Sequence, residues 1–93
     1  MNEVALILFV AGRNPLVEAA AERVRRACLA QPAPACHLTV VDVSIYSAVA
    51  AAERVFVTPT LLRRQPLPEQ RVVGDLSDAE RVLTGLGLAA PPP

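Results

Sequence analysis

The sequence is poor in aromatic residues. Only 3% of its 93 residues are aromatic, and tryptophan is absent. The hydrophobic fraction of 53% therefore consists largely of alanine and valine, and it predicts a folded domain rather than a disordered chain. The core is expected to contain mainly small aliphatic side chains, with Phe9, Tyr46 and Phe56 as its largest candidate members.

The sequence also lacks an excess of charge of either sign. Nine basic residues balance nine acidic ones, so the chain has no broad positive charge of the kind that binds nucleic acid. The apolar run Val4–Val10 is too short to cross a bilayer, and no basic segment precedes it as in a signal peptide. We therefore expect a cytoplasmic protein with neither a nucleic-acid nor a membrane partner.

Cysteine is scarce as well. Cys28 and Cys36 are separated by seven residues, which is not the C-x-x-C spacing of redox motifs. His37 is the one soft ligand nearby, and three such residues are too few for a metal site. In a reducing cytoplasm we interpret both cysteines as structural or incidental thiols, with a disulfide or a redox sensor as the alternatives. No metal and no cofactor are predicted.

Strands and helices are predicted to alternate in the first half of the chain. The nearly continuous apolar run Val4–Val10 predicts a strand buried on both faces. Asn14 followed by Pro15 is a typical helix start, and apolar residues at helical spacing predict a helix over residues 15–30. The β-branched segment His37–Val43 predicts a second strand, parallel to the first in a right-handed βαβ unit.

The second half is predicted to contain a helix, a hairpin and a last helix. Ala48–Arg54 favours a short helix, and Thr60–Arg64 and Arg71–Val73 predict two antiparallel strands around a proline-rich turn. Ser77–Glu80 matches a capping box, which predicts the start of another helix. The expected α/β order is β-α-β-α-β-β-α, the thioredoxin-like arrangement. Pro59 stands where that arrangement has a cis-proline.

The chain resembles the KaiB family over nearly its whole length. Each matching segment is short, but their order and spacing are specific: Leu8–Gly12, Val41–Val43, Thr58–Leu61, Arg71–Ser77, and Val82-Leu83 followed by Gly85-Leu86. The positions that we single out as family-motif or structural residues are Phe9, Gly12, Pro15, Asp42, Thr58, Pro59, Thr60, Gly74, Asp75, Leu76, Ser77 and Gly85. A single domain over residues 1–88 is expected, followed by a disordered proline-rich tail at residues 89–93.

The resemblance implies a non-enzymatic clock or timing protein that binds and regulates a KaiC-type ATPase. It also implies metamorphic behaviour, in which a self-associating ground state of order β-α-β-β-α-α-β converts to a thioredoxin-like monomer that binds KaiC. A KaiA-like protein and a histidine kinase are further partners that the family suggests, and dimers or tetramers are implied for the ground state. The helical Ala48–Arg54 and the capping box at Ser77–Glu80 favour the thioredoxin-like form.

Three arginines are candidates for partner binding. Arg63, Arg64 and Arg71 lie on or beside the predicted hairpin. They could protect the sheet edge and keep it soluble, or they could dock onto an acidic partner surface. The resemblance supports docking, because the matching basic positions contribute to KaiC contact in relatives.

Two other functions are weaker alternatives. A thiol oxidoreductase of thioredoxin-like fold needs a cysteine at the N-terminus of the first helix, and Asn14 and Pro15 occupy that position here. A KaiB-like sensory module associated with a histidine kinase usually lacks the Gly-Asp-Leu-Ser stretch that this chain has at residues 74–77. Asp42 and Asp75 are better explained as residues that cap a strand end and a turn than as paired catalytic acids.

Overall fold

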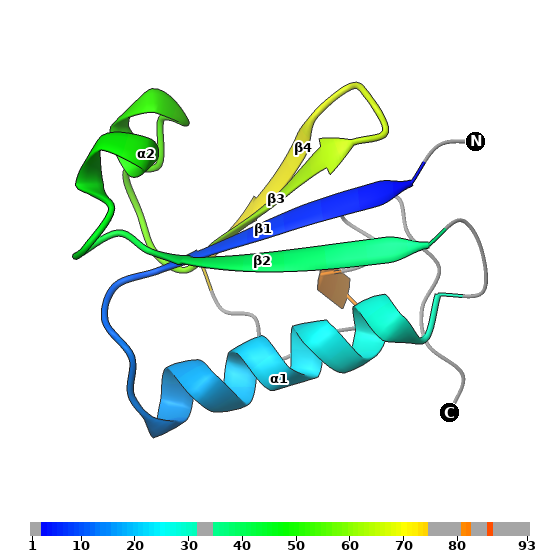
Figure 1. The fold of residues 1–93 in the computed structure, drawn as a ribbon, viewed down its shortest axis with the longest axis horizontal. Helices are drawn as coiled ribbons and strands as arrows, with labels where there is room; N and C mark the ends of the chain where they lie inside the picture. Colours follow the sequence, from blue (N-terminus) through cyan, green and yellow to red (C-terminus); the bar gives the residue numbers. More distant parts are fainter. Residues whose placement is uncertain (1–2, 32–34, 75–80, 83–85, 87–93) are drawn as a thin grey trace.

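A four-stranded sheet with a long helix across one face forms the body of the protein (Figure 1). The computed structural model describes residues 3–31, 35–74, 81–82 and 86. In chain order, the elements are β1 (Val4–Val10), α1 (Pro15–Leu29), β2 (Cys36–Asp42), α2 (Ser47–Ala52), β3 (Thr60–Gln65) and β4 (Gln70–Val73). This order confirms the thioredoxin-like prediction through β4. The last predicted helix start, with the capping box at Ser77–Glu80, and the tail at residues 89–93 lie outside the described residues.

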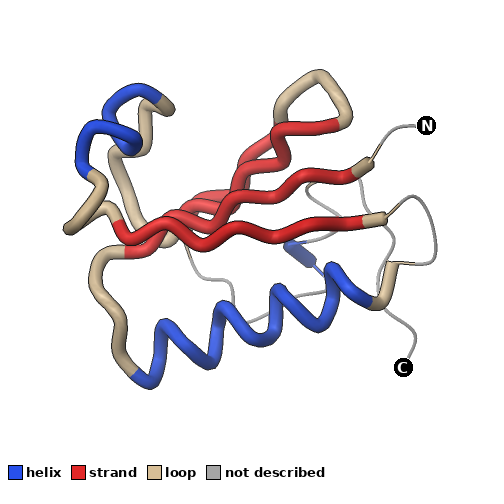
Figure 2. Tube along the Cα trace, viewed as in Figure 1, coloured by secondary structure: helices blue, strands red, loops and turns tan. Residues whose placement is uncertain are grey.

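The strand order across the sheet is β2-β1-β3-β4. β1 runs parallel to β2 and antiparallel to β3, and β3 pairs antiparallel with β4. The predicted βαβ unit and hairpin are therefore both present, and α1 forms the crossover between β1 and β2 (Figure 2). The described part of the chain has no helix that is long and apolar enough to span a membrane.

The main core lies between α1 and the sheet. Alternate residues of β1 pack there with the inner side of α1 and with β3, and the members of this cluster include Val4, Leu6, Leu8, Val10, Ala21, Val24, Cys28 and Leu61. On the other face of β1, Phe9 is fully buried, whereas Ala5 and Ile7 are only half-buried. Burial of β1 on both faces is thus confirmed only in part, because α2 is six residues long and lies at one end of that face (Figure 1).

Of the three candidate core aromatics, only Phe9 is in the core. Tyr46 is 56% exposed and Phe56 is 86% exposed, so the expectation for these two residues was wrong. The reason is their position on either side of α2: Tyr46 directly precedes the helix, and Phe56 lies in the loop after it. Within α2 itself, Ala50 is the residue that is buried.

Asn14 begins α1 as the sequence predicts. Its backbone is extended, and its side-chain oxygen accepts a hydrogen bond from the Val17 N–H at 3.0 Å, with Pro15 as the first helical residue.

Replacing Asn14 with alanine is expected to lower the free energy of unfolding by about 1 kcal/mol, because the Val17 N–H loses its partner. Urea denaturation would measure the loss. Serine at position 14 should restore most of it, and equal losses for alanine and serine would contradict a capping role.

Candidate functional site

Large apolar side chains are exposed together around α2. They all fall between residues 45 and 57, and we call this set the α2 surface: Ile45, Tyr46, Val49, Phe56 and Val57. Their exposed fractions range from 42% for Val49 to 86% for Phe56. Single exposed apolar residues are normal on a protein surface, but a concentration of them in one short segment is typical of a binding site. The segment stands away from the sheet, on the side opposite α1 (Figure 1).

Asp42 organises the turn that leads into α2. Its carboxylate accepts hydrogen bonds from the Gly12 N–H at 2.9 Å and from the N–H and the hydroxyl of Ser44 at 2.9 and 2.6 Å. Its carbonyl accepts from the N–H groups of Ile45 and Tyr46 at 3.1 and 2.9 Å. Gly12 has a positive φ of 76°, a conformation that glycine adopts at little cost. The turn-capping interpretation of Asp42 is therefore confirmed, while Asp75 lies outside the described residues.

These hydrogen bonds lower the pKa of Asp42 below its ordinary value of 3.8, chiefly through the Ser44 hydroxyl and then the Gly12 N–H. Because the folded pKa is the lower one, ionised Asp42 stabilises the fold above the unfolded pKa, and this contribution is lost as the pH falls through the folded pKa.

We therefore expect an Asp42→Asn variant to be less stable than the natural protein at neutral pH, with a difference that shrinks from about pH 5 to about pH 2. Thermal unfolding followed by circular dichroism across this range would measure the difference. Parallel curves for the two proteins would contradict a role for the ionised carboxylate.

The segment between α2 and β3 is held by the predicted Thr58-Pro59-Thr60 motif. The Thr58–Pro59 peptide bond is cis, as its place before the third strand suggests, and two further cis bonds precede Pro66 and Pro68. The hydroxyl of Thr60 donates to the Val57 carbonyl, and the Gly74 N–H donates to the Pro59 carbonyl at 3.0 Å. Phe56 and Val57 are therefore followed at once by an anchored turn. Leu76, Ser77 and Gly85, also singled out from the sequence, lie outside the described residues.

Two of the predicted arginines connect the end of α2 to the sheet. Arg64 forms an ion pair with Glu53, at the C-terminal end of α2. Arg71 donates from its guanidinium to the carbonyls of Glu53 and Arg54, at 3.0 and 3.2 Å. Both guanidinium groups thus lie beside the C-terminal end of α2. Their role in partner binding stays a prediction.

Arg63 is on the opposite face of β3, and the basic residues do not form one patch. It is 8% exposed, and its guanidinium donates to the carbonyls of Leu86 and Pro68 at 2.6 and 2.9 Å. Alternation along the strand separates it from Arg64, because consecutive side chains point to opposite faces of a sheet. In this conformation Arg63 is a buried structural residue, so the docking interpretation is kept for Arg64 and Arg71 alone.

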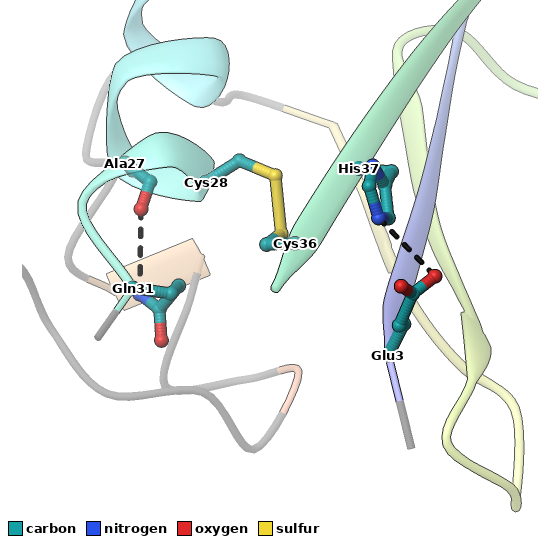
Figure 3. The surroundings of a disulfide bond; sticks show 6 residues. All are labelled: Glu3, Ala27, Cys28, Gln31, Cys36 and His37. Carbon is teal, nitrogen blue, oxygen red and sulfur yellow. Dashed lines mark hydrogen bonds and ion pairs between the residues drawn. A yellow bond between two sulfur atoms is a disulfide. The ribbon is translucent and has the colours of Figure 1, made fainter. Parts of the chain in front are cut away.

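Cys28 and Cys36 form a disulfide between the end of α1 and the start of β2 (Figure 3). The interpretation as incidental thiols was therefore wrong, and the disulfide alternative is the one that the structure shows. The last turn of α1 passes over the first residue of β2, which brings the two Cα atoms to 5.3 Å. The disulfide lies at the opposite end of α1 from the Asn14-Pro15 start.

Among the described residues, no group of three His, Cys, Asp or Glu side chains could hold a metal.

Comparison with known proteins identifies the relatives of this chain. The KaiB domain family matches residues 7–88. The circadian clock protein KaiB3 of Synechocystis sp. is 33% identical over 88 residues, which cover 95% of this chain and 86% of that protein. The circadian clock oscillator protein KaiB of Synechococcus elongatus is 37% identical over 83 residues, which cover 89% of this chain and 81% of that protein.

A solved structure shows the same fold. The N-terminal domain of Synechococcus elongatus SasA superposes with a TM-score of 0.75 at 25% sequence identity, over 92% of this chain and 81% of that one. This likeness agrees with the thioredoxin-like order of elements from β1 to β4 described above. The family match extends from within β1 through the α2 surface and beyond β4. From the sequence match and the fold together, we conclude that this chain belongs to the KaiB family.

Proposed function

We propose that this chain is a non-enzymatic clock or timing protein that binds and regulates a KaiC-type ATPase through its α2 surface. The observation that carries the proposal is the exposure of five large apolar side chains between residues 45 and 57. An isolated protein gains nothing from such exposure, whereas a binding partner would remove these side chains from water. The cytoplasm is the proposed location.

The composition of the α2 surface agrees with a docking role. Tyr46 and Phe56 are aromatic, the class of residue that contributes most to binding energy at protein interfaces. Arg64 and Arg71 stand at its border, where charged residues favour the correct orientation of an acidic partner. The surface therefore combines an apolar centre with a charged border that contains Arg64, Arg71 and the Glu53 carboxylate.

A catalytic role has little support. The N-terminus of α1, where a thioredoxin-like oxidoreductase needs its nucleophilic cysteine, carries Asn14 as the cap and Pro15 at the first position. Both cysteines of the chain are joined to each other at the far end of that helix. An insulin-reduction assay would test catalysis directly, and turnover by the purified protein would contradict the proposal.

Complex formation with the KaiC homologue of the same genome tests the proposal. The two proteins would be mixed with ATP and, separately, with ADP, and analysed by gel filtration. We expect co-elution with the ATPase in at least one nucleotide state. Absence of a complex in both states would overturn the proposal. Elution of this chain alone would also report dimers or tetramers, the self-association that the family suggests.

A second candidate function follows from the structural neighbour. The SasA domain has the same fold at 25% identity, so this chain could act beside a histidine kinase as a KaiB-like sensory module. A KaiA-like protein is a third candidate partner. Pull-down with the histidine kinase and with any KaiA homologue of the same genome, in parallel with KaiC, would discriminate these partners. Retention by the kinase alone would favour the sensory function.

A further inference from the structure

The Cys28–Cys36 disulfide borders a cavity that is large enough for a small molecule. This cavity has a volume of about 230 Å³, and the described residues that line it are Arg25, Cys28, Leu29, Cys36, His37 and Leu38. Cys28 is 2% exposed and Cys36 is 9% exposed, so Cys36 is the less buried residue of the pair.

The charge at this cavity favours an anionic small molecule. Arg25 is the one permanently charged side chain among the described residues that line it, and none of them is acidic. Arg25 also lies 3.7 Å from the Glu22 carboxylate, and His37 lies 3.2 Å from the Glu3 carboxylate. Both contacts are solvent-exposed, and the Arg25 side chain remains 42% exposed. Arg25 precedes Cys28 by one helical turn, and its charge partly offsets the negative end of the helix dipole, which disfavours a departing Cys28 thiolate.

The disulfide is also part of the core beneath the C-terminal segment. Cys28 and Cys36 belong to the same buried cluster as Val82 and Leu86. The Leu86 N–H donates to the Val82 carbonyl at 3.2 Å, and the Leu86 carbonyl accepts from buried Arg63. A change at the two sulfur atoms would therefore reach the packing of Val82 and Leu86.

We propose that Cys28–Cys36 is a reversible thiol–disulfide exchange site for anionic low-molecular-weight thiols, and that its redox state controls how firmly Val82 and Leu86 are held. The thiolate of one small thiol attacks the sulfur of Cys36 and forms a mixed disulfide, and the Cys28 thiolate leaves and takes up a proton. A second small thiolate attacks the outer sulfur of the mixed disulfide, which releases the oxidised small thiol and the Cys36 thiolate. Two electrons pass from the two small thiols to the protein, and the disulfide form of the small thiol reverses the reaction.

The kinetics of reduction by glutathione test the exchange site. The folded, oxidised chain would be mixed with increasing glutathione, and its free thiols would be counted by a maleimide gel-shift assay. We expect a rate that rises in proportion to glutathione, because the thiol attacks the folded protein directly. A rate that becomes independent of glutathione would show that the protein must first open, and would overturn the proposal. So would the absence of a disulfide in the oxidised chain.

The charge preference has a matched control. Arg25→Gln is expected to slow reduction by glutathione about threefold, from the loss of one screened charge near the sulfur atoms. Reduction by cysteamine, a cationic thiol, should slow less. Arg23→Gln removes a charge of the same helix that does not line the cavity, and it should leave both rates unchanged. Equal slowing by the two arginine variants would contradict a specific role for Arg25.

Coupling to the C-terminal segment needs its own readout. Amide hydrogen exchange at Leu86 would be compared in the oxidised chain, the reduced chain and a Cys28→Ala, Cys36→Ala variant, with the Leu62 amide as internal reference. Exchange at Leu86 is expected to accelerate on reduction relative to Leu62, and to be insensitive to glutathione in the alanine variant. Unchanged exchange at Leu86 would overturn the coupling. None of these measurements requires the partner ATPase.

Discussion

Replacing Arg63 with methionine is expected to lower the free energy of unfolding by about 3 kcal/mol. The guanidinium of Arg63 is buried, and it donates to the Leu86 carbonyl at 2.6 Å and to the Pro68 carbonyl at 2.9 Å. A hydrogen bond from a charged donor contributes about 1.5–3 kcal/mol, and its loss leaves a buried carbonyl without a partner. Methionine preserves much of the side-chain volume, so the change reports on the two hydrogen bonds, reduced by the cost of the buried Arg63 Nε, which has no hydrogen-bond partner among the described residues. Urea denaturation at neutral pH would measure it.

Arg64→Met is the matched control for this experiment. Arg64 is the next residue of β3, but its side chain is 40% exposed and its ion pair with Glu53 is only partly buried. An exposed ion pair contributes at most about 1 kcal/mol, so this variant should lose much less stability than Arg63→Met. Equal stability of Arg63→Met and the natural protein would contradict the prediction. It would mean that the cost of burying the charge cancels the two hydrogen bonds.

The different positions of Arg63 and Arg64 show where prediction from this sequence ends. The strand itself was predictable, and strand alternation requires the two side chains to lie on opposite faces. The sequence does not show which face is covered, because the carbonyl that Arg63 contacts belongs to Leu86, far along the chain. Two adjacent arginines therefore resemble one basic surface until the packing of distant segments is known.

Local signals explain why most elements were predicted well. β1 is a continuous apolar run, and α1 begins with a capping asparagine and a proline, two features whose effect does not depend on the rest of the fold. The disulfide was only an alternative in the prediction because it depends on how α1 crosses over β2, and neither cysteine belongs to a recognisable motif. The apolar residues around α2 were missed as a site because hydrophobicity alone does not place a residue inside. The available signal was that Ile45, Phe56 and Val57 flank a helix too short to bury them.

Replacing Phe56 with serine is expected to weaken binding of the KaiC-type ATPase about 30-fold without destabilising the fold. Phe56 is 86% exposed in the free protein, so its ring contributes little to folding. Burial of an aromatic side chain at an interface contributes about 2 kcal/mol, which corresponds to about a 30-fold change in affinity. Titration of the labelled protein with the ATPase, in the nucleotide state that supports binding, would measure the affinity. Thermal unfolding of the free variant would confirm that its fold is intact.

Leu16 provides the control that makes this result specific to the α2 surface. It is 83% exposed, nearly as much as Phe56, but it lies in the first turn of α1 on the other side of the sheet. Leu16→Ser removes another large, exposed apolar side chain, so a general loss of surface hydrophobicity would affect both variants. Binding through the α2 surface predicts that Phe56→Ser loses affinity and Leu16→Ser does not. Equal losses in the two variants, or a loss confined to Leu16→Ser, would place the partner on a different face of the protein.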